Sequence, residues 1–191
     1  MTTDMTHTAV EVIRRCVLWG VYYFDEIVEE VETAVYPNEI DRDWVVSRVE
    51  EELQNKESEE ATWPERTDCD RLHDVFESFW EEGIIALEAP GNTQDEGLED
   101  VSYFYHEAGG EQSGIVGYCY YVANDIPLVL AEGILRLTYG DIRGDDAKGV
   151  EIGRRVRTAL QAAGFTVEWD ESIQTRLAIL GFRWQMRRWS R

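Results

Sequence analysis

The densest polar cluster of the sequence lies at residues 67–74 and contains a cysteine and a histidine four positions apart. On a helix, Cys69 and His73 would share one face and could ligate a metal ion together. A structural zinc site takes four ligands, and no second pair follows at a suitable spacing. The alternative is an acidic helix start that the helix dipole stabilises. We therefore expect no metal ion and no other cofactor.

An acidic run at residues 95–100, followed by His106 and Glu107, offers oxygen ligands for Ca²⁺ or Mg²⁺. Paired carboxylates could also act as general acid and base in a hydrolase. A calcium loop needs alternating ligands around a central glycine, and this run lacks that pattern. Because the chain has 39 acidic residues, neighbouring carboxylates arise by chance. We expect a solvated helix face, and a divalent-cation-dependent hydrolase or transferase remains the alternative.

Nucleophilic catalysis needs a serine, cysteine or threonine beside a base. The chain has three histidines and no G-x-S-x-G motif. Cys119 lies within an aromatic run, Tyr118–Tyr121, where a buried structural thiol is expected. The sequence therefore favours a protein without catalytic activity over an enzyme.

Residues 135–155 superficially resemble the pyrophosphate loop of acetyltransferases, in which a strand, a glycine-rich loop and a helix start hold phosphates. Here Gly149 and Gly153 are four positions apart, and that family requires closer glycines at the helix start. Asp145 and Asp146 would also place negative charge where the phosphates bind. We expect no nucleotide site.

The elements that would position these residues follow from the hydrophobic pattern. Apolar residues recur at helical spacing in four segments before residue 82, whereas residues 54–62 read as a loose acidic stretch. After Gly83, strand-like segments alternate with helical ones, and residues 147–163 form the clearest helix. This order predicts an α+β fold with N-terminal helices followed by a mixed sheet of about four to five strands with flanking helices. We expect one domain, residues 1–191, with a helical portion at about 1–82 and a mixed portion at about 83–191.

The net charge is −21, and it is unevenly distributed. Residues 1–142 carry 8 basic and 33 acidic side chains, and residues 143–191 carry 10 basic and 6 acidic ones. Such a body repels phosphate backbones, so we expect no nucleic-acid partner, although a basic protein is a candidate partner. We interpret the basic, tryptophan-containing run at 183–191 as a terminal strand whose arginines pair with acidic side chains.

Three widely spaced cysteines argue against a disulfide framework and fit a reducing compartment. No basic start followed by an apolar stretch is present, so we expect no signal peptide. No apolar run approaches the ~20 residues of a membrane span. We expect a cytoplasmic protein that does not bind membranes.

The chain resembles a bacterial family of domains of unknown function that is common in GC-rich genomes. The resemblance is densest from residue 63 to 188, and the family brings no established activity. It rests on an ordered series of short motifs, which are Trp63-Pro64, Thr67-Asp-Cys-Asp-Arg-Leu72, Phe76, Gly83-Ile84-Ile85-Ala86, Gly117-Tyr118, Gly133-Ile-Leu-Arg-Leu-Thr-Tyr-Gly140, Ile152-Gly153, Gly164-Phe-Thr-Val-Glu-Trp-Asp170 and Trp184 with Arg187-Arg188.

Two departures from the family pattern concern possible chemistry. Many members of the family that the chain resembles have a cysteine cluster after the first predicted strand. This chain has no cysteine at the corresponding residues 90–94. Where members show histidine and then Gln-Asp, this chain has Val122, Asn124 and Asp125. The resemblance implies that any metal or thiol chemistry of the family is lost here.

We expect a non-catalytic binding or regulatory module, with an acidic interaction or immunity-type protein as a further alternative. Binding residues are expected in turns or at the ends of elements, where sites concentrate. The candidates are Asp70, Arg71, Asp125, Trp169, Asp170 and Arg176. For Arg71 and Asp170, a structural ion pair is an equally good interpretation.

Overall fold

A computed structural model describes residues 3–35 and 40–187. The described residues form two compact units. Arg66–Trp184 make up one unit, and the residues before Arg66 and after Trp184 make up the other. Among the described residues, no helix combines the length and the apolar character needed to cross a bilayer.

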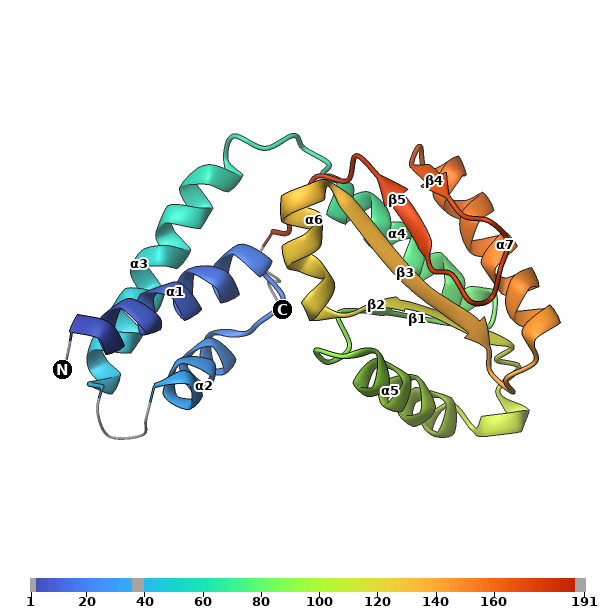
Figure 1. Cartoon of the computed structure of the whole chain (residues 1–191), viewed down its shortest axis with the longest axis horizontal. Coiled ribbons are helices and arrows are strands. Elements are labelled where there is room, and N and C mark those ends of the chain that lie inside the picture. Colours follow the sequence, from blue (N-terminus) through green and yellow to red (C-terminus); the bar gives the residue numbers. More distant parts are fainter. Residues whose placement is uncertain (1–2, 36–39, 188–191) are drawn as a thin grey trace. The chain divides into compact units, whose positions relative to one another are not determined.

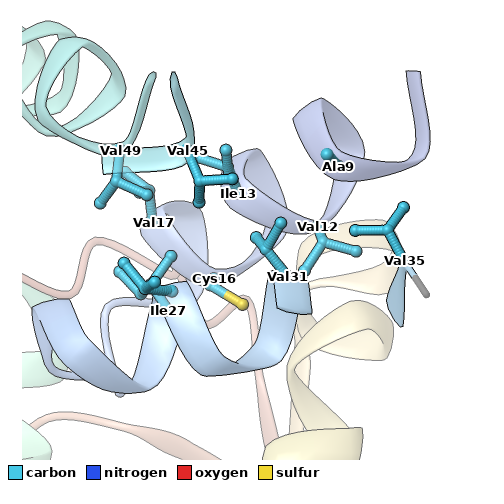
Figure 2. Close-up of a cluster of buried hydrophobic side chains, with 11 residues drawn as sticks. Ala9, Val12, Ile13, Cys16, Val17, Ile27, Val31, Val35, Val45 and Val49 are labelled. Atoms are coloured by element: carbon cyan, nitrogen blue, oxygen red, sulfur yellow. The ribbon is translucent and has the colours of Figure 1, made fainter. Parts of the chain in front are cut away.

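The first unit is built from three helices, α1 (Thr3–Trp19), α2 (Phe24–Ala34) and α3 (Arg42–Glu60) (Figure 1). Each of the three packs against the other two. Figure 2 shows their apolar side chains converging, among them Ile13, Val31 and Val45, which are fully buried. Burying each such side chain contributes about 1.5–3 kcal/mol, so this cluster is the main stabilising feature of the unit.

The expectation of a loose segment at residues 54–62 is wrong, because α3 continues to Glu60. The physical reason is Lys56, which is buried although it lies in a run of charged residues. Its ammonium group donates a 2.8 Å hydrogen bond to the carbonyl of Val17 near the end of α1, and Glu60 lies 3.9 Å from it. This contact fixes the last turns of α3 to α1.

The second unit begins with α4 (Asp68–Glu81) and continues as β1 (Ile84–Glu88), α5 (Gln94–Glu107), β2 (Gly117–Tyr121), α6 (Ile126–Glu132), β3 (Ile134–Asp141), α7 (Asp146–Ala162), β4 (Thr166–Glu168) and β5 (Leu177–Leu180). The sheet has the order β1-β2-β3-β5-β4. Strands β1 and β2 are parallel, and the other neighbours are antiparallel. These helices and this five-stranded mixed sheet confirm the predicted α+β class.

Side chains alternate between the two faces of the sheet, and each face carries its own helices. On one face Tyr120 packs with Val101 of α5. On the other face the ring of Tyr121 lies 6.2 Å from that of Phe76 in α4. Figure 1 shows α5 running below β1 and β2. Helix α7 packs against β2, β3 and β4 on the face of Tyr121, where its Gly153 approaches Tyr139, and α5 covers β1 and β2 on the opposite face.

The predicted terminal strand at 183–191 is wrong for its described part, because residues 182–187 have no regular structure, and residues 188–191 lie outside the described residues. Gly181 adopts a left-handed conformation with φ of 67°, which turns the chain away from the ladder after β5. Phe182 then stacks 5.8 Å from Phe165, and Trp184 lies edge-on to Tyr121 at 5.9 Å. Aromatic burial replaces strand pairing in this segment.

Candidate functional site

A buried carboxylate lies at the carboxyl end of β1 and bonds to a histidine and a tyrosine. Nδ1 of His73, in the middle of α4, lies 2.6 Å from Oε1 of Glu88. The hydroxyl of Tyr121, at the end of β2, donates to Oε2 of Glu88 over 3.3 Å. The Glu88 side chain is only 7% exposed, whereas that of His73 is half exposed. A carboxylate in this position orients an imidazole and stabilises its charged form.

The two groups shift each other's protonation. Burial lowers the pKa of His73, but the hydrogen bond to Glu88 and the charges of Glu88, Glu77 and Asp74 outweigh it, so the net pKa is raised. Burial raises the pKa of Glu88, and the hydrogen bond from His73 opposes part of this shift. Both shifts have the same consequence: the pair favours folding at low pH, and this contribution is lost as pH rises through the folded-state pKa values.

Glu88→Gln should lower the pKa of His73, because the hydrogen-bonded carboxylate that raises this pKa would be gone, while burial and the weaker effects of Glu77 and Asp74 would remain. An NMR titration of the imidazole protons measures this pKa directly. Glu77→Gln is the matched control, since it removes a nearby carboxylate that is not hydrogen-bonded to His73, and its effect should be smaller. An unchanged pKa in Glu88→Gln would show that the His73–Glu88 contact does not exist in solution.

Two of the predicted binding residues, Asp125 and Arg176, bond to each other. Arg176 reaches Asp125 through two nitrogens, with Nη1–Oδ1 at 2.9 Å and Nη2–Oδ2 at 2.5 Å. It also donates to the carbonyl of Arg136 in β3. Asp125 is 9% exposed at its side chain and accepts a further hydrogen bond from the amide of Val122. The pair thus joins the segment after β2 to the start of β5.

The predicted residues Asp70 and Arg71 stabilise the ends of helices. Asp70 accepts from the amide of Thr67 at 2.7 Å as part of a capping box at the start of α4. Arg71 donates to the carbonyl of Ala163 just after α7, at 3.0 Å. Its guanidinium group also pairs with Asp68 and lies 4.4 Å from the ring centre of Phe165. A cation at the C-terminus of α7 is stabilised by the helix dipole.

The last two predicted residues belong to the turn between β4 and β5. Trp169 lies edge-on to Tyr139 at 5.3 Å, and its indole donates to the carbonyl of Ser172. Asp170 accepts from the amide of Ser172 and from the hydroxyl of Thr175, and these bonds lower its pKa. The six predicted residues therefore lie in several separate places of the second unit, each bonded to the chain itself, and their role in binding stays a prediction.

A pocket of about 500 Å³ lies where β2 begins, β3 ends and α7 passes over the sheet. Its apolar lining comes from three segments, through Ile115 and Val116 before β2, Ile142 after β3, and Ile152 on α7. Val116 is exposed although it is apolar. The volume is in the range of small-molecule sites, which extends from about 300 to 1,000 Å³.

Charged side chains surround this apolar lining, and two of the cationic ones form only long contacts. Lys148 lies 3.9 Å from Asp145, and Arg143 lies 3.8 Å from Glu111. Both contacts are long and solvent-exposed, so each contributes little and can be exchanged for a ligand. Arg155 is held more firmly, by the carbonyl and the carboxylate of Glu82. Three further carboxylates complete the lining, those of Glu111, Asp141 and Glu151.

Backbone amides of the loop between β3 and α7 are bonded to carboxylates of the same loop. Oδ2 of Asp141 accepts from the amides of Arg143 and Asp145, at 2.9 and 3.2 Å. Oδ1 of Asp145 accepts from the amide of Lys148 at the helix start. The chain's own carboxylates therefore occupy the amides that a phosphate group would need.

The described residues contain no group of three or more histidine, cysteine or acidic side chains that could hold a metal ion. All three cysteines are buried thiols outside any disulfide. Burial raises the pKa of Cys16 to about 11 and that of Cys119 further, so both are uncharged thiols at neutral pH. Neither thiol is activated as a nucleophile.

The two segments that depart from the family pattern lie side by side at the carboxyl ends of β1 and β2. The amide of Ala123 donates to the carbonyl of Gly91 at 3.1 Å. Nearby, the hydroxyl of Tyr120 donates to the carbonyl of Gln94, whose side chain bonds to Thr138. Open α/β sheets bind ligands at this edge. Here the polar groups of the edge bond to one another.

Sequence reasoning missed Glu88, Tyr121 and the lining of the pocket. One signal was present for Glu88, because it is the one acidic residue in the apolar strand segment 84–89. No pattern in the sequence links positions 111–116 with 141–155, since the sheet register brings them together.

A family model described as Domain of unknown function (DUF6891) matches residues 2–188, which confirms the resemblance. No curated protein and no solved structure matches the chain. Since the match spans nearly the whole sequence, the chain belongs to the DUF6891 family of domains of unknown function.

Proposed function

We propose that this domain is a non-catalytic binding module that holds a small amphipathic carboxylate in the pocket beside α7. The observation that carries the proposal is the composition of the lining. An apolar wall of isoleucine and valine lies next to cationic side chains whose present partners are distant and solvent-exposed. Sites for small ligands combine such apolar walls with a few charged groups that fix orientation.

The charges favour a ligand with both an acid and an amine. Lys148 and Arg143 can exchange their long contacts for a ligand carboxylate. Glu151 lines the same pocket, and no ion pair within the described residues involves it, so it can accept an ammonium group. An apolar amino acid would place its side chain on Ile142 and Ile152. We therefore propose apolar amino acids as the ligand class.

Isothermal titration with three isosteric compounds tests this class. L-leucine has both charged groups, 4-methylpentanoate has only the carboxylate, and leucinamide has only the amine. We expect saturable binding that is strongest for leucine, weaker for 4-methylpentanoate and weakest for leucinamide, because each lost ion contact weakens binding.

Lys148→Gln should weaken leucine binding by about tenfold, the effect of one charged hydrogen bond. Because Lys148 is 61% exposed at its side chain, the melting temperature should stay unchanged. Arg14→Gln, which removes an exposed cation from α1, is the matched control and should bind like the wild type. Equal binding of all three compounds, or equal effects of both substitutions, would contradict the proposed pocket.

A further inference from the structure

Three exposed aromatic side chains form a continuous strip on the second unit, which we call the aromatic strip. Trp80 lies in the last turn of α4, and Tyr103 and Phe104 lie in the second half of α5. Their exposed fractions are 37%, 59% and 39%. Phe104 lies edge-on to both neighbours, 5.9 Å from Trp80 and 5.5 Å from Tyr103. Contiguous exposed apolar surface of this kind marks interaction sites.

The strip lies along the outer edge of the sheet. Strand β1 is the first in the order β1-β2-β3-β5-β4, so one side of it has no neighbouring strand within residues 3–35 and 40–187. The indole of Trp80 donates a 3.1 Å hydrogen bond to the carbonyl of Ala86 in β1. This bond occupies an acceptor that an added strand would need. A partner would therefore contact the rings and not extend the sheet.

The surroundings of the strip carry negative charge that the chain does not neutralise. Helix α5 contains no lysine or arginine, and the single arginine of α4, Arg71, lies in its first turn and pairs with Asp68. The acidic side chains on the two helices near the strip are Glu77, Glu81, Glu99, Asp100 and Glu107. Within the described residues none of these five forms an ion pair, whereas the acids near the arginines of α7, such as Glu171 and Glu82, are paired.

We propose that the aromatic strip docks a basic segment of another protein. Arginine and lysine side chains can lie on the faces of the three rings while their charged groups reach the flanking carboxylates. Each interaction supports the other, because the rings position a cation that the carboxylates attract. This surface is separate from the pocket and does not depend on the proposed small ligand.

Charge complementarity decides between the possible occupants. A nucleic acid would bring phosphates against the unpaired carboxylates, which is unfavourable. A second copy of this chain would bring a net charge of −21 to the same surface. A basic protein segment is attracted both by the aromatic rings and by the flanking carboxylates. The negative charge of the surface also steers such a segment toward it and accelerates association.

Fluorescence anisotropy with labelled deca-arginine tests the proposal on the full-length chain. Glu99→Gln, Asp100→Asn and Glu107→Gln are combined in one variant, which should weaken binding about tenfold through the loss of three surface charge contacts. Tyr103→Ser should weaken it about threefold through the loss of one exposed cation–π contact. Neither variant removes the hydrogen bond of Trp80 to β1.

The matched control removes the same charge elsewhere, through Glu29→Gln, Glu57→Gln and Glu59→Gln on α2 and α3. It should weaken binding less than twofold, because it leaves the carboxylates of α4 and α5 beside the three rings in place. Equal losses in both triple variants would overturn the proposal, because binding would then follow total charge alone. Sedimentation of the wild type tests the second-copy alternative: a dimer that Tyr103→Ser dissociates would also overturn it.

Discussion

Arg176→Met should lower the free energy of unfolding by about 3 kcal/mol, the largest effect we expect from a single polar substitution. The substitution would leave the carboxylate of Asp125 nearly buried without its cation. Because the side chain of Arg176 is itself 28% exposed, we expect a loss of unfolding free energy at the lower end of the range for broken buried ion pairs. Chemical denaturation followed by far-UV circular dichroism measures it.

Two further variants distinguish the effect of breaking the Asp125–Arg176 ion pair from the effect of losing a charge in general. Asp125→Asn combined with Arg176→Met should be less destabilised than the sum of the single variants, because neither charge then stays buried alone. Arg154→Met removes an exposed contact with Glu171 and should change stability by less than about 0.5 kcal/mol. If Arg176→Met matched Arg154→Met, the Asp125–Arg176 pair would have no structural role, and its predicted role in binding would gain support.

Gly153→Ala should destabilise the protein by about 2 kcal/mol, the cost of overpacking a filled interior. A Cβ atom at this position of α7 would lie 2.7 Å from the rings of Tyr139 and Trp169. These two rings pack edge-on against each other and cannot both move away. In an unobstructed helix the same substitution stabilises by about 1 kcal/mol, so the sign of the effect reports the close approach of helix and sheet.

Gly149→Ala is the matched control for this position, one turn earlier in the same helix. A Cβ atom there would first meet the terminal methyl group of Ile173, which can rotate away. We expect a change of less than about 1 kcal/mol. Thermal unfolding of both variants distinguishes the cases, and equal melting temperatures would contradict the packing of α7 on Tyr139 and Trp169.

The hydrophobic pattern predicted most of the fold because burial follows the period of each element. Val45 and Val49 of α3 follow the helical spacing of apolar residues before residue 82, and both are fully buried. The pattern failed where a single side chain had an unusual role. Lys56 reads as a solvated residue in an acidic run, yet its buried ammonium group holds α3 against α1.

The candidate sites could not be predicted to the same extent, since they depend on long-range register. Asp125 and Arg176 were both singled out as binding residues, but their pairing across 51 positions could not be seen. The sequence places His73 beside Cys69 on one helix face. Its structural partner is Glu88, which becomes adjacent only when β1 packs against α4.

Methyl NMR of the isoleucine side chains during a titration with L-leucine tests the central claim most directly. We expect saturable shifts of the δ-methyl groups of Ile115, Ile142 and Ile152, which line the pocket. Ile13 and Ile27 in the core of the first unit should not shift. The binding-module account would be contradicted if the three pocket signals stayed unchanged up to about 10 mM leucine, a concentration beyond the weakest useful small-ligand affinity.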